Sequence, residues 1–219
     1  MHCFFTALIL AIVAVACSGD ESLPTAPDQL IPAIVAFGDS LTSGPGVPPA
    51  QTYPALLQQR ISSDGYRYRV INAGVTGDTT SEALPRFNDA LVSETRIVIL
   101  ALGINDGLRG VPIATVERNL ETMIERARSR NIAVLLCGME APPIGGLNYS
   151  IEFHRLYARL AERYNLPLVP FFLLRVAGNP DLNLDDRFHP NAAGHRVIAE
   201  TIWPYLRPML ISPATGGNL

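Results

Sequence analysis

Lysine is absent from this chain of 219 residues, in which all 17 basic residues are arginine and are outnumbered by 20 acidic residues. A protein that holds nucleic acid through its phosphates needs an excess of positive charge. The net charge of -3 therefore argues against nucleic acid as a partner.

Cysteine is nearly as scarce, with three residues, two of which lie within the first 17 positions. This distribution offers no disulfide framework. The third, Cys137, ends an apolar run and has no histidine close to it in the sequence. We therefore expect a buried, inert thiol there rather than a nucleophile.

Clusters of histidine and acidic residues with the spacing of metal ligands are also absent. We therefore expect neither a metal-dependent hydrolase nor a cofactor. His154, in a predicted helix, has no acidic partner in a recognisable motif, and His195 is expected to be a surface or capping residue of the last helix.

The N-terminal segment, residues 1–16, is predicted to be a signal peptide. Its apolar run from Phe4 to Ala16 is interrupted only by Thr6 and is shorter than the roughly 20 residues that span a membrane. The sequence AVAC at residues 14–17 resembles a bacterial lipobox, so Cys17 is the predicted site of lipid modification. No lysine or arginine precedes the run, and this departs from the usual pattern of a signal peptide. The alternative to lipid modification is secretion of the protein without an anchor.

Residues 17–32 are rich in Ser, Gly, Asp and Pro and have few large apolar side chains. Such a segment buries too little apolar surface to fold, so we expect a flexible, lipid-anchored tether. Residues 33–210 are long and apolar enough for one core and form one predicted domain, with a C-terminal tail at residues 211–219.

Strands and helices alternate along the predicted domain. Apolar runs predict strands at residues 33–37, 69–71, 97–102, 132–137 and 167–170, and helices are predicted at 52–63, 80–92, 113–130, 150–164 and 191–207. Strands that are joined by helical crossovers favour an α/β fold: a three-layer α/β/α sandwich around a five-stranded parallel sheet.

Ser40 follows the first predicted strand, in the sequence IVAFGDSLT at residues 34–42. Ligands bind at the carboxyl edge of parallel sheets, which makes Ser40 a candidate nucleophile. A serine hydroxyl needs a base to take its proton, and the base needs an acceptor that fixes its tautomer. His189 can act as the base, and Asp186 can act as its acceptor. Asp185 is a rival for the second role, but it lacks the three-residue offset to His189.

The Gly-x-Ser-x-Gly elbow of the α/β-hydrolases is absent, although the order Ser, Asp, His matches theirs. Two further blocks lie between the Ser40 and His189 segments: NAGVTGDT at residues 72–79 and LGINDG at residues 102–107. In this order the four blocks resemble the SGNH, or GDSL, hydrolase family, and most closely its bacterial periplasmic branch of thioesterases, arylesterases and lysophospholipases.

The resemblance implies a flavodoxin-like SGNH hydrolase fold with the strand order 2-1-3-4-5. It assigns the oxyanion hole to the Ser40 N–H, the Gly77 N–H and the side-chain amide of Asn105, with Gly74 as the rival glycine. Ile104 stands where close relatives have glycine, and its branched side chain is expected to narrow the pocket.

The expected function is that of a serine esterase, which cleaves acyl esters, thioesters or lysophospholipids through an acyl-enzyme. A carbohydrate acetylesterase is the alternative among enzymes, and a non-catalytic lipoprotein binding module on the same fold is the alternative outside them.

Residues 142–149, PPIGGLNY, are expected to form a mobile loop over the site. Asp39 and Asp106 are expected to hold loops by accepting backbone hydrogen bonds, and a cap or turn is the structural alternative for Asp39 and Ser40.

The lipobox-like sequence generates a first prediction. The expressed protein should partition with membranes and incorporate labelled fatty acid, because Cys17 is expected to carry the lipid. Cys17→Ala should abolish both properties, measured by fractionation and by radiolabelling. A wild-type protein that stays soluble and unlabelled would contradict this expectation.

Overall fold

The computed structural model describes residues 30–210. The predicted signal peptide, the lipidation site Cys17, nearly all of the tether and the tail at 211–219 lie outside the described residues. Between residues 30 and 210 no helix is both long and apolar enough to cross a membrane.

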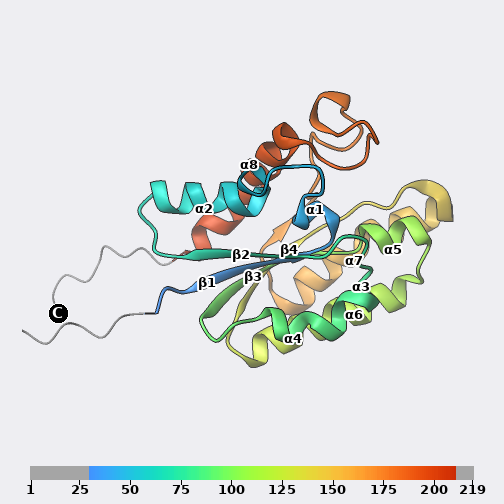
Figure 1. Ribbon diagram of the computed structural model, residues 1–219. Coiled ribbons are helices and arrows are strands. Elements are labelled where there is room, and N and C mark those ends of the chain that lie inside the picture. The colour runs from blue at the N-terminus through green and yellow to red at the C-terminus, as the bar shows by residue number, and fades with distance from the viewer. Residues whose placement is uncertain (1–29, 211–219) are drawn as a thin grey trace, which may run out of the picture. The chain divides into compact units, whose positions relative to one another are not determined.

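A five-stranded parallel sheet runs through this part of the chain (Figure 1). In spatial order its strands are β2 (Arg69–Gly74), β1 (Ala33–Gly38), β3 (Thr95–Ala101), β4 (Ala133–Cys137) and β5 (Leu168–Val169). All neighbouring pairs are parallel. Both the α/β architecture and the predicted strand order are confirmed. Every residue of β1 is buried, as expected for a strand with a neighbour on each side and helices on both faces.

Helices cover both faces of the sheet (Figure 1). On one face lie α2 (Tyr53–Ser63) and α8 (Ala192–Leu206); on the other lie α3 (Thr80–Ala83), α4 (Phe87–Ala90), α6 (Ile113–Ser129) and α7 (Leu147–Tyr164). Two short helices, α1 (Ser40–Ser43) and α5 (Ile104–Arg109), follow β1 and β3. Single turns of 3-10 helix are η1 (Pro49–Gln51), η2 (Leu84–Arg86), η3 (Pro143–Gly145), η4 (Pro180–Leu182) and η5 (Arg207–Met209).

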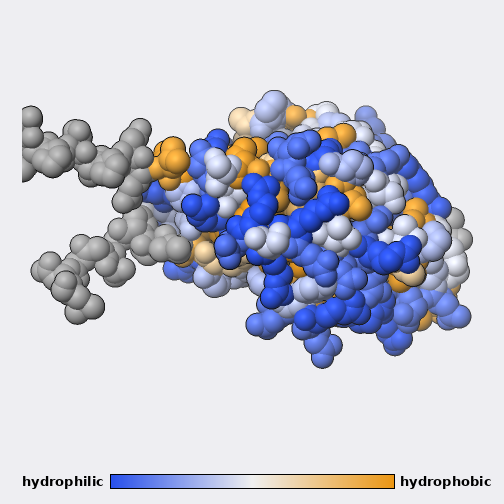
Figure 2. All heavy atoms as spheres, turned by 90° about the horizontal axis from the view of Figure 1, so that it is seen from below, coloured by the Kyte–Doolittle hydropathy of each residue, from blue (hydrophilic) through white to orange (hydrophobic). Residues whose placement is uncertain are grey.

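The helix α6 illustrates how the sequence pattern produces the layers. Its buried residues recur at helical spacing and form one stripe against the sheet: Val116, Leu120, Met123, Ile124 and Ala127. The opposite side carries charged residues, and the outer surface on this face of the molecule is largely hydrophilic with scattered hydrophobic side chains (Figure 2).

The predicted helix at residues 80–92 is interrupted in the structure. Pro85 lies inside it, and proline has no N–H to donate and crowds the preceding turn. The chain therefore forms α3, the 3-10 turn η2 and α4 in succession instead of one helix. The prediction of a loop at 142–149 is also partly wrong, because α7 already begins at Leu147.

The expectation that His195 is a surface or capping residue is wrong. His195 lies in α8, but it is only 1% exposed and its Nδ1 accepts a hydrogen bond from the Tyr53 N–H at 3.2 Å. Its Nε2 is buried and has no hydrogen-bond partner among residues 30–210. Burial disfavours the charged imidazolium and lowers the pKa of His195 from 6.5 to about 4.

This lowered pKa makes the stability of the protein sensitive to acid. As the pH falls from about 6.5 to about 4, the unfolded chain takes up a proton at His195 while the folded protein does not, so the free energy of unfolding falls. Over the whole window this contribution amounts to about 3 kcal/mol. Urea denaturation should show a flatter pH dependence for His195→Asn, whose amide oxygen can still accept from Tyr53.

The control is Gln59→Asn, a substitution of an exposed side chain that does not titrate, which should keep the wild-type dependence on pH. Comparison of the variants separates the contribution of His195 from those of other titrating groups. Equal slopes for wild type and His195→Asn would refute the assignment.

Candidate active site

The candidate site lies at the carboxyl edge of the sheet, where three neighbouring parallel strands end. Ser40 follows β1, Gly77 follows β2 and Asn105 follows β3. The backbone is tightly packed where β1 ends, because a Cβ at Gly38 would lie 2.1 Å from Thr42 Oγ1 and 2.6 Å from the Ala101 carbonyl oxygen. Only glycine fits at this position without a rearrangement of the chain around it.

Asp39 caps the short helix that carries the serine. Its Oδ1 accepts a hydrogen bond from the Leu41 N–H at 2.9 Å, which confirms the predicted backbone contact. Ser40 is the first residue of α1 and is 3% exposed. Asp39 is completely buried, and its Oδ2 has no hydrogen-bond partner among residues 30–210. Mainly because of this burial, the pKa of Asp39 is raised to about 7.

The structure brings Ser40, His189 and Asp186 together although they are far apart in the chain. His189 Nε2 lies 3.0 Å from Ser40 Oγ, and His189 Nδ1 lies 2.6 Å from Asp186 Oδ2. A proton can therefore pass from the serine to the histidine, while the carboxylate holds the ring and its tautomer. This is the arrangement that the three-residue offset indicated.

Asp186, and not its rival candidate Asp185, contacts His189. Its Oδ1 accepts from the backbone N–H groups of Phe188 and His189, each at 2.9 Å. The hydrogen bond from the His189 ring and these two backbone bonds lower the pKa of Asp186 to about 2. The carboxylate therefore stays ionised at neutral pH.

A tight turn presents the histidine and the aspartate to the serine. The Leu184 N–H donates to the His189 carbonyl at 2.8 Å, and the Arg187 N–H donates to the Leu184 carbonyl at 2.8 Å. Arg187 has a left-handed backbone with φ of 59°. Two residues after His189, Asn191 caps α8 by accepting from the N–H groups of Ala193 and Gly194.

The three predicted oxyanion donors lie on the segments that follow β1, β2 and β3, and each has an N–H that is free of an acceptor among residues 30–210. Gly77 has φ of 89°, and its N–H makes no hydrogen bond within residues 30–210, whereas the rival Gly74 N–H is already bonded to Asn72 Oδ1 at 3.0 Å. Asn105 Nδ2 donates one of its two hydrogens to the Asp78 carbonyl at 2.9 Å and so keeps the other. The Ser40 N–H, at the start of α1, has no acceptor within its own helix.

Four side chains hold these loops, and only one of them, Asp106, was predicted from the sequence to do so. Thr79 and Glu82 form a reciprocal capping box at the start of α3, a pattern visible as Thr-x-x-Glu. Asp106 accepts from the N–H and the hydroxyl of Thr80, at 2.8 and 2.7 Å, which confirms its predicted loop contact. Arg109 donates to the Gly77 carbonyl at 2.9 Å and pairs with Glu82.

An apolar pocket with a volume of about 450 Å³ is lined by chain neighbours of His189 and Asn105, although neither of these two residues lines it. Phe188, next to His189, and Ile104, next to Asn105, both line it. The remaining lining residues are mostly apolar and come from other loops: Leu108, Glu140, Ala141, Pro142, Phe171, Leu173, Ala177, Gly178 and Arg187. Because Ile104 is 5% exposed and lines this pocket, its side chain takes up space that glycine would leave open.

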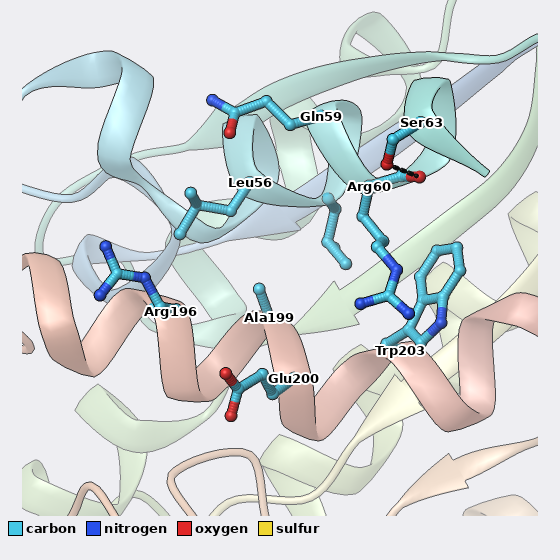
Figure 3. Close-up of a pocket in the computed structure, with 9 residues that line it drawn as sticks. Leu56, Gln59, Arg60, Ser63, Arg196, Ala199, Glu200 and Trp203 are labelled. Carbon is cyan, nitrogen blue, oxygen red and sulfur yellow. Dashed lines mark hydrogen bonds between the residues drawn. The ribbon is translucent and has the colours of Figure 1, made fainter. Parts of the chain in front are cut away.

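A second groove, of about 480 Å³, lies between α2 and α8 (Figure 3). In it the Arg60 guanidinium lies over the Trp203 ring, 5.1 Å from the ring centre. Arg196, Leu56 and Glu200 also line this groove, but no residue of the Ser40 site does.

The remaining polar candidates do not join the site. His154 Nδ1 lies 2.6 Å from Glu140 Oε1, so it does have an acidic partner, but this pair is exposed and on another segment. Cys137 is buried, as expected, and burial raises the pKa of its thiol. In the described part of the chain no group of three or more His, Cys, Asp or Glu side chains could hold a metal ion.

Comparison with known proteins gives the family of the chain. The model of the GDSL-like Lipase/Acylhydrolase family matches residues 36–197. Esterase TesA of Pseudomonas aeruginosa is 39% identical over 179 residues, which cover 81% of this chain and 89% of the relative. Thioesterase 1/protease 1/lysophospholipase L1 of Escherichia coli K12 is 32% identical over 178 residues, covering 81% and 84%.

A crystal structure of TesA has the same fold, with a TM-score of 0.77 and 38% identity over 81% of this chain and 99% of that one. Since the family model matches residues 36–197 and both relatives cover 81% of this chain, the chain belongs to the GDSL-like lipase/acylhydrolase family.

Proposed function

We propose that this carboxylic ester hydrolase works through an acyl-enzyme formed on Ser40, with His189 as the base and Asp186 as its orienting partner. The observation that carries the proposal is the continuous relay from Asp186 Oδ2 to His189 to Ser40 Oγ, with distances of 2.6 and 3.0 Å. A binding module would have no need for this relay, so the relay favours an enzyme over that alternative.

In the acylation step His189 Nε2 takes the proton from Ser40 Oγ as the oxygen attacks the substrate carbonyl. Negative charge develops on the carbonyl oxygen, where we propose that the N–H groups of Ser40 and Gly77 and the Asn105 amide donate. The tetrahedral intermediate then collapses. His189 gives its proton to the leaving alcohol or thiol, and the acyl group remains bonded to Ser40.

Deacylation uses the same groups in reverse. His189 takes a proton from a water molecule, which attacks the acyl carbon, and the same donors stabilise the second oxyanion. When the bond to Ser40 Oγ breaks, His189 returns the proton to the serine. The ionised Asp186 offsets the positive charge on the imidazolium in both steps.

For the substrate we propose a small-molecule ester or thioester with a short to medium acyl chain, or a lysophospholipid. The names of the E. coli and P. aeruginosa relatives support this substrate class. The apolar pocket beside His189 suits an acyl chain, and the bulk of Ile104 within it favours the shorter ones. The carbohydrate acetylesterase remains the second candidate because a narrow pocket also suits an acetyl group.

For the location we propose an exported protein that is held at the periplasmic side of a bacterial membrane through Cys17. The support is the apolar run and the lipobox-like sequence that precede the domain. Plain secretion is the alternative.

Hydrolysis of p-nitrophenyl esters from acetyl to palmitoyl tests the substrate proposal. Rates should be highest for short to medium chains, and Ile104→Ala should improve kcat/KM for longer chains several-fold, because it enlarges the pocket beside His189. Ser40→Ala should abolish hydrolysis in every case. Activity confined to acetylated sugars would instead support the acetylesterase.

Replacement of Asn105 tests the oxyanion hole. Because the donor acts mainly in the transition state, Asn105→Ala should lower kcat by roughly 10²- to 10³-fold with little change in KM. The variant should still react slowly with a fluorophosphonate, since Ser40 and His189 remain, whereas Ser40→Ala should not react. Thermal melts serve as the control. Near wild-type kcat would remove Asn105 from the site, and a much earlier melt would make its role structural.

A further inference from the structure

Arg86, at the end of the 3-10 turn η2, ties together three separate segments beneath the candidate oxyanion hole. Its Nε donates to Asp78 Oδ2 at 2.7 Å, one terminal nitrogen donates to the Ala73 carbonyl at 2.8 Å, and the other donates to the Gly38 carbonyl at 2.8 Å. All three nitrogens of the guanidinium thus have different partners. One planar group links the end of β1, the end of β2 and the loop after β2.

The guanidinium is also fixed from one side by an aromatic ring. It lies over Phe37 of β1, 4.2 Å from the ring centre, and Phe37 in turn packs edge-on against the buried Phe87. The Arg86 side chain is 25% exposed and that of Asp78 is 13% exposed. Charge-assisted hydrogen bonds and a cation–π contact are stronger in such a partly desolvated place than at the surface.

The segments held by Arg86 are those that carry the oxyanion donors. Gly38 lies two residues before Ser40, and Asp78 directly follows Gly77. The Asp78 carbonyl accepts from Asn105 Nδ2 at 2.9 Å, while its carboxylate accepts from Arg86. Ser40 and Gly77 are therefore each connected to Arg86 through one hydrogen bond and a short stretch of chain, and Asn105 is connected to it through two hydrogen bonds to Asp78.

Charge gives Arg86 a second effect on the same site. Asp39, Asp78 and Asp106 are the chain neighbours of the three proposed donor residues Ser40, Gly77 and Asn105, and Asp39 and Asp106 are buried. Negative charges of this kind oppose the growth of another. The ion pair with Arg86 offsets the charge of Asp78, the one that adjoins Gly77.

We propose that Arg86 is a positioning residue of the oxyanion hole: it sets the distance between the Ser40 and Gly77 N–H groups and neutralises Asp78 beside them. It has no contact with Ser40 Oγ or His189, and it acts only through the donors. The inference rests on the proposed function, because it presumes that these donors stabilise an oxyanion.

Arg86→Gln and Arg86→Lys test the proposal in kinetics on a short p-nitrophenyl ester. Misplacement of the donors should lower kcat by about 10²-fold in Arg86→Gln with KM nearly unchanged. Arg86→Lys should lose less, since it keeps the charge but its single ammonium cannot reach three acceptors in a plane. Adding Asp78→Asn to Arg86→Gln should restore part of kcat, because no unpaired carboxylate then remains next to Gly77.

Arg128→Gln is the matched control. Arg128 likewise donates to a backbone carbonyl, that of Tyr164 at 2.9 Å, and lies over an aromatic ring, 5.5 Å from its centre, but it contacts no residue of the site. Its kcat should equal that of wild type. Thermal melts of all variants identify any that are unfolded at the assay temperature. If Arg86→Gln is unfolded, the proposal is tested by the kcat of Arg86→Lys instead.

A double-mutant cycle with Asn105→Ala separates positioning from general stabilisation. If Arg86 acts through the oxyanion donors, Arg86→Gln should lower kcat by a smaller factor in the Asn105→Ala background than in wild type, because an incomplete set of donors gains less from correct positioning. Additive losses, or a kcat for Arg86→Gln equal to that of Arg128→Gln, would overturn the inference. The proposed function fails separately, if Ser40→Ala keeps its activity.

Discussion

The parallel pairing of β1 with both β2 and β3 is the constraint on which the site depends. Because all three strands run in the same direction, their carboxyl ends meet at one edge, and the residues that follow them must share one small volume. Gly38 shows how small this volume is, since a single added carbon there would meet both Thr42 and Ala101. The serine, the glycine and the asparagine therefore lie on segments that begin at the same edge of the sheet.

Crowding also explains why the polar groups around the site are linked so densely. A buried carboxylate or backbone N–H that has no partner costs free energy, so a compact cluster of loops must pair its own polar atoms. Asp106 with Thr80 and Arg86 with its three acceptors do this. Asp39 Oδ2 and His195 Nε2 remain without partners within residues 30–210, and burial shifts the pKa of both groups toward the neutral form.

The parts predictable from sequence were those with a local signal. Apolar runs predicted the five strands, and the offset between Asp186 and His189 predicted a contact that one turn can make. The prediction of His195 failed because its burial depends on the packing of α8 against the segment at Tyr53, which no local pattern encodes. The role of Arg86 was equally hidden, because its three acceptors are a side chain and two carbonyls from distant positions. Pro85 did offer a local signal, as proline interrupts helices, and it marked the break between α3 and α4.

The turn from Asn183 to Pro190 carries both Asp186 and His189. The interactions that hold this turn in place differ from those that hold the strands of the sheet. Asp185, Asp186 and Arg187 are exposed, and between the buried ends of the turn only Phe188 is among the side chains that pack against the core, so the middle of the turn is held largely by hydrogen bonds. Segments of this kind can open locally at a much smaller free energy than the whole domain needs to unfold. Heat or denaturant can therefore uncouple the base from Ser40 while the sheet persists, so the temperature at which turnover stops and the temperature at which the fold melts are set by different parts of the molecule.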